Sequence, residues 1–432
     1  MLDKEQKMAV TAPESKVIVV AGAGSGKTRV ITERLKYLLE KGANPANIVC
    51  ITFTNMAAEE MAERLQNVSG IGDAFIGTIH SFANKVLKAS DNDGNFEIFS
   101  EEHNVNFHKY LINRYCKHLT FDRWMQYEDL RKDAEIGKIE EEEVDAFLTP
   151  SERAELCLIH RNQCDIEKGD DYPRSIDGMC KARNIITFDE LLLKATEYFK
   201  SRNIYPEYVL VDELQDVGSL EYGFIRALNA KNYFFVGDDW QAIYGFKGGN
   251  VCIFKSLVKD VNWKVYWLNN NYRNSKAVMD IADRVIFQVY DKLEKNIHRC
   301  NEAKGYVEIA SKAVVESVLA SLEKNEHNFG EWFFLVRTNK QIFELLDLCK
   351  KYHLPCIAVK REGMSLQALR GVLQSNVIKL LTVHSSKGLE SKNVLLYGSF
   401  PIEQPPYLKN EEERKVMYVG VTRAKENLII LN

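Results

Sequence analysis

The chain has 432 residues, 45% hydrophobic and 27% charged, which suits a globular protein of two or three domains. Its formal net charge of −4 excludes a uniformly basic nucleic-acid binder, so any nucleic-acid site must be a local groove. No apolar run approaches the roughly 18 residues of a membrane span, and Met1–Lys7 shows no signal peptide. The nine scattered cysteines are typical of reduced thiols, so we expect a cytoplasmic protein.

The first expected elements alternate strands with helices. An apolar strand, Val17–Val20, leads into a glycine-rich loop and a helix over 29–40, and Ile48–Phe53 leads into a second helix. Further strands are expected at Tyr208–Asp212 and Tyr233–Gly237. This alternation predicts an α/β fold with a parallel sheet covered by helices on both faces.

Residues 88–184 interrupt this pattern. They are polar and helix-rich with few strand signals, so we interpret them as a helical accessory domain inserted into the first α/β unit. Within the insertion, Glu128–Asp145 holds nine acidic residues against three basic ones. A solvated helical face is the simplest interpretation, and a protein-docking surface or repulsion of DNA are the alternatives.

Strands and helices alternate again in the last part of the chain. We expect strands at Lys264–Leu268, Glu331–Val336, Cys356–Val359, Val377–Val383, Asn393–Tyr397 and Asn427–Leu431. The predicted organisation is therefore a first α/β domain of residues 1–87 and 185–258, an insertion of residues 88–184, and a second α/β domain of residues 259–432.

The glycine-rich loop after the first strand has the pattern of a P-loop, with Ala21 where the general pattern has glycine. Its backbone N–H groups and the following helix N-terminus form a phosphate site. Lys27 neutralises phosphate charge and the Thr28 hydroxyl suits Mg²⁺. The candidate ATP-binding residues of this segment are Ala21, Gly22, Ala23, Gly24, Ser25, Gly26, Lys27, Thr28 and Arg29.

Two carboxylates, Asp212 and Glu213, end a later apolar strand, at the edge where open α/β sheets bind ligands. Asp212 suits Mg²⁺ directly or through water, and Glu213 suits the base that acts on the attacking water. The alternative is the ordinary enrichment of acids at a helix N-terminus. Combined with the P-loop, the pair indicates nucleotide hydrolysis.

The order of motifs along the chain resembles that of UvrD/Rep-type superfamily 1 DNA helicases. The motifs that carry this resemblance extend from Leu2 to Lys425: Leu2–Gln6, Asp212–Asp216, Gly237–Phe246, Asn271–Arg273, Val336–Asn339, Thr382–Glu390 and Tyr418–Lys425. The resemblance implies two RecA-like parallel-sheet domains with ATP and Mg²⁺ between them. It implies an enzyme that hydrolyses ATP while moving along single-stranded DNA, with 3′-to-5′ polarity.

The resemblance also assigns roles around the nucleotide. Gln6 would read adenine, Tyr272 would stack on the base, and Glu390 would approach the sugar. Gln241 and Arg273 would contact the γ-phosphate, and Arg423 would act as an arginine finger from the second domain. These assignments fit the chemistry, because phosphoryl transfer depends on charge stabilisation at the γ-phosphate.

A single-strand track needs aromatic faces for bases and polar groups for phosphates. Candidates follow several strands, and the resemblance assigns DNA contact to Phe53, Thr54, Asn55, Thr78, His80, Tyr244, Phe246, Thr382 and His384. Alone, such aromatic and histidine side chains are more often structural. The family usually has Trp-Arg where this chain has Phe246-Lys247, so a lysine point charge replaces the guanidinium fork.

The segment between Asn339 and Thr382 is shorter than in full-size relatives. It leaves room for little beyond a helix, a strand and a connector, so we expect a compact member in which the large second accessory domain is absent or vestigial. The chain ends at Asn432, after the last expected strand, and we expect no fused nuclease domain.

The sequence leaves three alternatives to, or additions to, an ATPase that moves along single-stranded DNA. The first is a nucleic-acid-responsive ATPase subunit that gates a partner nuclease, for example in phage defence. The second, a P-loop kinase, conflicts with the glutamine in the acidic box and with the distant arginine motifs. The third is a metal or iron–sulfur site at Cys116, Cys157, Cys164 and Cys180, whose spacing lacks close Cys-x-x-Cys pairs and so favours ordinary thiols.

Overall fold

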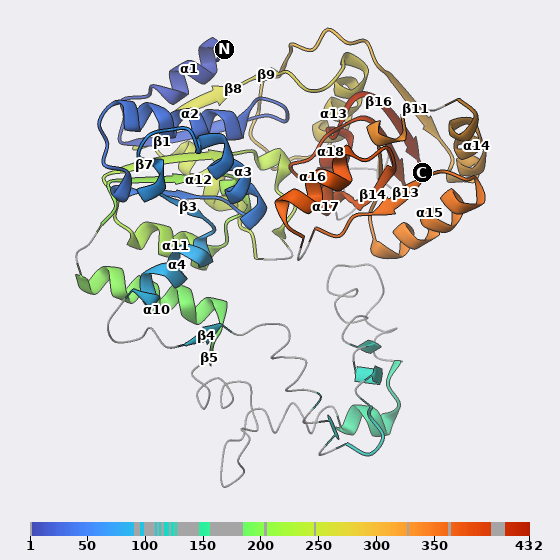
Figure 1. Ribbon diagram of the computed structural model, residues 1–432, viewed down its shortest axis with the longest axis horizontal. Coiled ribbons are helices and arrows are strands. Elements are labelled where there is room, and N and C mark those ends of the chain that lie inside the picture. The colour runs from blue at the N-terminus through green and yellow to red at the C-terminus, as the bar shows by residue number, and fades with distance from the viewer. Residues whose placement is uncertain are drawn as a thin grey trace. The chain divides into compact units, whose positions relative to one another are not determined.

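The structure is a computed structural model (Figure 1) that describes residues 2–89, 96–98, 109, 112–113, 116–120, 122–124, 126–127, 147–155, 185–202, 205–245, 248–325, 328–361, 364–398 and 411–432. Its internal contacts divide the chain into two compact units. The larger unit comprises residues 1–79 and 205–432, and the smaller unit comprises residues 80–204. The acidic stretch 128–145 and Cys157, Cys164 and Cys180 lie outside the described residues.

The first sheet of the larger unit is parallel throughout its described strands. Their spatial order is β3 (Phe75–Gly77), β2 (Ile48–Ile51), β6 (Tyr208–Val211), β7 (Asn232–Gly237), β1 (Lys16–Ala21) and β8 (Lys264–Leu268). The helices of this part are α1 (Lys4–Val10), α2 (Lys27–Glu40), α3 (Asn55–Leu65), α11 (Ser219–Ala227) and α12 (Val251–Lys259). Buried strands of this kind are apolar on both faces, and β1 is buried at every residue after Lys16.

The second sheet is parallel as well. Its described strands lie in the order β11 (Tyr306–Ala310), β16 (Ala424–Leu431), β15 (Ser391–Tyr397), β12 (Trp332–Val336), β14 (Ile378–Thr382) and β13 (Cys356–Ala358). Its helices are α13 (Lys276–Phe287), α14 (Val315–Asn325), α15 (Asn339–Lys351), α16 (Leu366–Gln374), α17 (Val383–Ser386) and α18 (Glu411–Val421). Between the two sheets in sequence, β9 (Asn270–Asn271) pairs with β10 (His298–Arg299). The fold-class prediction, α/β with parallel sheets, is confirmed.

One expected strand belongs to a different sheet from the one predicted. Lys264–Leu268 forms β8, as expected, but β8 pairs with β1 and so completes the first sheet. The sequence analysis placed it in the second α/β unit because it begins the second run of alternating strands and helices. The sheets therefore do not divide at residues 258–259.

The described part of the smaller unit contains α4 (Ile79–Lys88), which begins at the unit boundary, and α10 (Phe188–Arg202). It also contains the short parallel pair β4 (Glu97–Ile98) and β5 (Ile185–Ile186). Phe82 of α4 and Phe199 of α10 stack with their ring centroids 6.0 Å apart, so aromatic packing joins the two helices.

The connectivity places the polar motifs at one edge of the first sheet. The P-loop follows β1, Asp212 follows β6, Asp238 follows β7 and Phe53 follows β2, all at carboxyl ends of parallel strands. Open α/β sheets bind their ligands at this edge. From the second sheet, Glu390 and Arg423 directly precede β15 and β16, so that sheet contributes residues from the amino ends of its strands.

Candidate functional site

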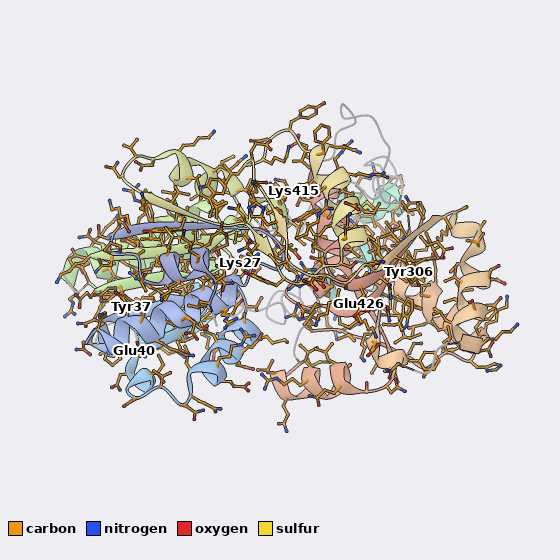
Figure 2. All side chains as sticks on the ribbon, turned by 90° about the horizontal axis from the view of Figure 1, so that it is seen from above. Lys27, Tyr37, Glu40, Tyr306, Lys415 and Glu426 are labelled. Atoms are coloured by element: carbon orange, nitrogen blue, oxygen red, sulfur yellow. The ribbon has the colours of Figure 1, made fainter. Side chains whose placement is uncertain are left out.

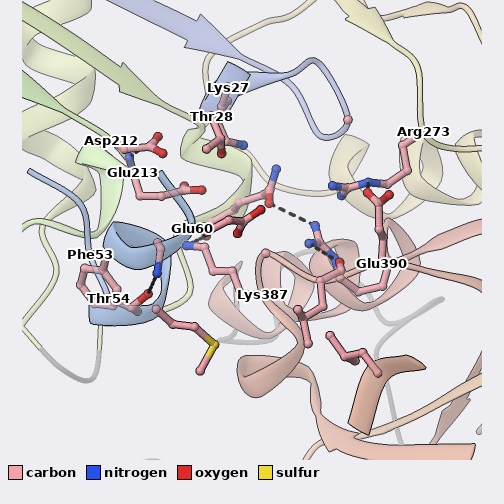
Figure 3. A pocket seen from close by; sticks show the side chains of 18 of the residues that line it. Lys27, Thr28, Phe53, Thr54, Glu60, Asp212, Glu213, Arg273, Lys387 and Glu390 are labelled. Carbon is pink, nitrogen blue, oxygen red and sulfur yellow. Dashed lines mark hydrogen bonds and ion pairs between the residues drawn. The ribbon is translucent and has the colours of Figure 1, made fainter. Parts of the chain in front are cut away.

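A cavity of about 770 Å³ in the larger unit gathers most of the predicted site residues (Figure 3). The first sheet supplies its P-loop, acidic and aromatic side chains, and the second α/β part supplies cations and Glu390. The predicted residues that line it are Gly22, Gly24, Ser25, Gly26, Lys27, Thr28, Arg29, Phe53, Thr54, Asp212, Glu213, Gln241, Tyr244, Arg273, Glu390 and Arg423. Residues of the ATP and DNA groups therefore share one continuous space.

The P-loop conformation depends on two glycines. Gly24 and Gly26 have φ values of 65° and 85°, in the left-handed region that favours glycine. A Cβ on Gly26 would lie 2.8 Å from Nε2 of Gln6, and one on Gly24 would lie 2.7 Å from Cβ of Arg273. The loop thus packs tightly and ends where α2 begins at Lys27, with the helix N-terminus at the cavity. Figure 2 labels both ends of α2, Lys27 and Glu40.

Lys27 begins a chain of polar contacts that crosses the cavity. Its Nζ lies 3.6 Å from Oδ2 of the buried Asp238. Gln241 donates from Nε2 to the same carboxylate oxygen at 2.5 Å, and Arg423 donates from Nη2 to Oε1 of Gln241 at 3.2 Å. Burial alone would raise the pKa of Asp238, but Lys295 and Lys27 outweigh it and hold the pKa below its usual value. A charged carboxylate therefore connects the P-loop lysine to the second sheet.

The acidic pair lies beside Lys27 in Figure 3. Glu213 has φ 52° and donates its backbone N–H to Oδ1 of Asp212 at 2.9 Å. Burial, and then Glu213, raises the pKa of Asp212 to about 7. Burial opposes ionisation of Glu213 too, but Lys27 and Lys387 outweigh it and lower its pKa. Glu213 is thus the charged acceptor of the pair, while Lys27 and Lys387 only partly offset the effect of burial on Asp212.

The residues present fit a magnesium ion. Thr28 and Asp212 line the same cavity and offer hydroxyl and carboxylate oxygens, the hard ligands that Mg²⁺ prefers. A divalent cation would also offset the buried charge of Asp212. Over the described residues no group of three or more His, Cys, Asp or Glu side chains could hold a metal ion, so phosphate oxygens would have to complete the coordination.

The cations from the far side of the cavity are held by internal partners. Arg273 donates from Nε to Oε2 of Glu390 at 2.6 Å, and Nζ of Lys425 lies 2.7 Å from the other oxygen of Glu390. Arg423 is 1% exposed and donates from Nη1 to the Leu389 carbonyl at 3.1 Å. Burial, and then Arg273, lowers the pKa of Arg423 to about 9. An anion in the cavity would stabilise this guanidinium.

Lys387 joins the two α/β parts at the centre of the cavity. Its ammonium forms a buried ion pair with Oδ2 of Asp216 and donates to the Gln241 carbonyl at 2.9 Å. It also lies 5.0 Å from the ring centroid of Tyr244. Burial opposes the charge of Lys387, but Asp216 and Glu213 outweigh it and raise its pKa. The same cation therefore contacts the acidic motif and the aromatic candidates.

The aromatic candidates stack on one another. The rings of Phe53 and Tyr244 lie 4.9 Å apart at 24°, and the Tyr244 hydroxyl donates to the His384 carbonyl at 3.2 Å. His384 approaches the Ile243 carbonyl with Nε2 at 3.2 Å, which requires the proton on that nitrogen. Burial, and then Arg337, lowers the pKa of His384 to about 4, so the ring is neutral. Each ring therefore has one face occupied by the other, so a base that stacks between them requires the rings to separate.

Several predicted residues lie away from the cavity lining. Gln6 donates from Nε2 to the Ser25 carbonyl at 2.9 Å and accepts from the Asp3 N–H at 3.1 Å, so its amide supports the P-loop. Tyr272 is half-exposed and its hydroxyl donates to Asp3 at 2.5 Å. Of the other predicted residues, Ala21 at the end of β1 and Ala23 within the loop are buried, and Asn55, Thr78, Thr382 and His384 lie outside the lining.

Two other predicted DNA-contact residues are His80 and Phe246. His80 belongs to the smaller unit, where its ring meets that of Phe188 edge-on at 4.9 Å. Phe246 lies outside the described residues. The predicted roles of all these residues stay predictions.

Sequence reasoning missed four charged residues that the structure brings to the site. The motifs that carry the resemblance contain Asp216, Asp238 and Lys387. The signal available in the sequence was the presence of these charged residues beside predicted catalytic residues. Lys295 stands in none of these motifs, and its contacts with Asp238 and the Ala21 carbonyl appear only in three dimensions.

Comparison with known proteins identifies the family. Residues 2–262 match the family model of the UvrD/REP helicase N-terminal domain, and residues 359–432 match that of the UvrD-like helicase C-terminal domain. The chain belongs to the UvrD/Rep helicase family. The resemblance seen in the sequence is thereby confirmed.

Named relatives agree with this assignment. The chain is 30% identical to a probable DNA helicase of Mycoplasma pneumoniae, over 100% of the chain and 83% of that protein. It is 29% identical to the ATP-dependent DNA helicase PcrA of Staphylococcus aureus, over 82% of the chain and 50% of PcrA. It is 30% identical to DNA helicase II of Escherichia coli, over 68% of the chain and 42% of that protein. The chain thus spans about half the length, or less, of the last two.

Within the described ranges, no helix has both the length and the apolar character that crossing a membrane requires. Between Thr338 and β14 the chain forms α15, β13 and α16, with residues 362 and 363 outside the described part. α15 and β13 match the expected helix and strand, and α16 is a further helix that lies where the connector was expected.

Proposed function

We propose that this protein is an ATP-dependent DNA translocase and helicase that hydrolyses ATP between its two parallel-sheet domains while moving along single-stranded DNA. The observation that carries the proposal is the single cavity lined by Lys27 and Glu213 from the first sheet and by Arg423 from the second. Phosphoryl transfer requires positioned cations and an oriented water, and this cavity offers the groups for both.

Each side chain has a proposed task in hydrolysis. Lys27 and the N–H groups at the start of α2 bind phosphate oxygens, and the charged Glu213 orients or deprotonates the attacking water. Thr28 and Asp212 would hold Mg²⁺, which supplies charge neutralisation to the phosphates when bound. Gln241, Arg273 and Arg423 approach the γ-phosphate, so that charge developing there meets Lys27 from the first sheet and Arg423 from the second.

Movement on DNA follows in this proposal from the shared cavity. Lys387 contacts Asp216 beside the acidic pair and also the ring of Tyr244. A shift of the second sheet on hydrolysis would therefore change the Phe53–Tyr244 stack. We infer that these rings, with Thr54, bind bases and phosphates of the single strand, and the 3′-to-5′ polarity is proposed from the family resemblance. The domain boundaries given in the sequence analysis are part of the same proposal, except that Lys264–Leu268 belongs with the first sheet.

The decisive experiment measures ATP hydrolysis with and without single-stranded DNA. We expect strong stimulation by DNA in the parent protein and loss of turnover in Lys27→Ala and Glu213→Gln. Lys36→Ala is the matched control, because Lys36 lies on the same helix but does not line the cavity. Its ammonium pairs with Glu33 at 2.8 Å. Normal hydrolysis in both cavity variants would contradict the site assignment.

Polarity needs its own assay. Displacement of streptavidin from oligonucleotides biotinylated at the 3′ or the 5′ end reports the direction of movement. Displacement from the 5′ end is expected for 3′-to-5′ movement, and displacement from the 3′ end would reverse the assignment. The alternative of an ATPase subunit that gates a nuclease has no observation of its own in the structure.

A further inference from the structure

Lys295 lies beneath the P-loop in the connector between α13 and β10. Its side chain is 1% exposed, and its ammonium lies 2.5 Å from Oδ1 of Asp238 and 2.8 Å from Oδ1 of Asp239. It also donates to the Ala21 carbonyl at 3.1 Å and lies 4.7 Å from the ring centroid of Trp240. A buried ammonium is costly unless it is paired, and here two carboxylates pair it.

The connector that carries Lys295 is fixed to the same segment. The N–H of Leu293 donates to Oδ2 of Asp239 at 2.7 Å, and Nε1 of Trp240 donates to the Leu293 carbonyl at 2.9 Å. These bonds set the position of the lysine backbone independently of its ammonium. Lys295 is therefore held at Asp238 by the fold and is not a surface side chain that happens to reach inward.

Asp238 contacts two cations, the side-chain amide of Gln241 and the backbone N–H of Trp240. Oδ1 contacts Lys295, while Oδ2 accepts from Gln241 and lies 3.6 Å from Lys27. Lys27 must leave its carboxylate partner if it is to bind phosphate. Within the described residues, Lys295 would then be the cation left in contact with Asp238, which is fully buried.

We propose that Lys295 is a positioning residue that releases Lys27 to the nucleotide. By balancing the charge of Asp238, it lets Lys27 exchange that carboxylate for phosphate and keeps Asp238 ionised as the acceptor that orients Gln241. The inference rests on the proposed ATP site. It adds to that site a residue which does not line the cavity itself.

The proposal fixes the direction of each effect. Without Lys295, Lys27 would be the cation left in contact with Asp238 among the described residues. ATP would then have to draw Lys27 out of a tighter ion pair with Asp238. At lower pH the poorly compensated carboxyl would take up a proton, and Gln241 would lose its charged acceptor. Burial opposes the charge of Lys295, yet Asp238 and Asp239 raise its pKa, which agrees with a permanent charge at this position.

The test is a double-mutant cycle read by binding of a fluorescent ATP analogue with Mg²⁺, which requires neither hydrolysis nor DNA. Lys295→Met is expected to weaken binding about tenfold, which corresponds to the middle of the usual range of coupling energies between contacting residues. In a separate assay, the same variant should add an acidic limb to the pH profile of hydrolysis. Asp238→Asn in the Lys295→Met background should restore binding to within about threefold of Asp238→Asn alone, since Asn keeps an acceptor and removes the charge.

Lys292→Met is the control on the same connector, because Lys292 contacts Glu294 and the Val289 carbonyl and does not reach Asp238. Unchanged binding in folded Lys295→Met, or a double variant that binds much more weakly than Asp238→Asn alone, would overturn the proposal. If Lys295→Met does not fold, the comparison of the double variant with Asp238→Asn still decides. Failure of the parent protein to bind the analogue would instead contradict the proposed function.

Discussion

The buried pair of Lys387 and Asp216 allows a prediction with a calculable size. We consider Lys387→Met, which removes the cation but keeps most of the side-chain volume. Asp216, 2% exposed, then loses its ion-pair partner, and the Gln241 carbonyl loses a donor at 2.9 Å. Breaking one side of a buried pair generally costs roughly 3–5 kcal/mol, because the remaining charge is uncompensated.

The pKa of Asp216 limits this cost. Burial raises it to about 6 in the intact protein, although Lys387 opposes the shift. In the variant the carboxyl can escape its unpaired charge by taking up a proton. At about pH 7.5 the ionised form of the parent is more stable than its protonated form by about 2 kcal/mol, at 1.36 kcal/mol for each pH unit above 6, and the variant loses this advantage. With about 1 kcal/mol for the lost hydrogen bond, the free energy of unfolding should fall by about 3 kcal/mol, and by only about 1 kcal/mol at about pH 6.

Urea unfolding of four proteins at both pH values measures this effect: the parent, Lys387→Met, Asp216→Asn and the double variant. The double variant has no buried charge at this pair and should recover most of the loss, giving a coupling of about 2 kcal/mol at the higher pH. Lys392→Met is the matched control, because its pair with Glu331 at 3.2 Å is more than a third exposed and should change stability by less than about 1 kcal/mol. A loss of the same size at both pH values would refute the protonation argument, and a double variant no more stable than Lys387→Met would refute the pairing.

Three further predictions concern the same unit. As pH falls from 6.5 to 4, His384 stays neutral in the folded state but takes up a proton in the unfolded state, because burial lowers its folded-state pKa. The free energy of unfolding should therefore fall by up to about 3 kcal/mol over this range. Urea unfolding measures this loss, which the His384→Gln variant should not show. Phe53→Ala and Tyr244→Ala should each weaken single-strand binding by about 1–3 kcal/mol in fluorescence titrations while the affinity for ATP without DNA changes little, and unchanged DNA affinity would remove these rings from the track. The half-exposed pair of Arg370 and Glu63, which joins α16 to α3, should contribute less than about 1 kcal/mol in a double-mutant cycle of stability.

Much of the fold could be predicted because strand periodicity and loop chemistry agree locally. β1 extends the expected Val17–Val20 by one residue at each end, and the glycines at positions 24 and 26 have the left-handed backbone that a tight phosphate loop requires. The pairing partner of a strand is a different kind of information. β8 has ordinary strand composition, and its place beside β1 is set by packing between segments nearly 250 residues apart, which no local pattern carries.

The candidate site was predictable to the extent that its residues stand in ordered motifs. Lys27, Glu213 and Arg423 do line one cavity. The partners of these residues within the protein were not predictable. Lys295 contacts Asp238 from a connector without a motif, and the Gln6 amide donates to the P-loop carbonyl of Ser25. Such contacts depend on side-chain directions in the folded chain.

The internal partners explain how one cavity can respond to the presence of phosphate. Lys27 is near Asp238, Arg273 is paired with Glu390, and Arg423 is bonded to Gln241, so each proposed phosphate ligand already has an acceptor within the protein. Binding of ATP is then an exchange of partners, whose free energy is the difference between phosphate and the internal acceptor. Because the contact between Arg423 and Gln241 joins residues that flank different sheets, the exchange alters what holds the sheets together, and loss of the γ-phosphate returns the cations to their internal partners. A chain that binds and hydrolyses ATP in this way changes its shape in each cycle, which is the property that movement along a strand requires.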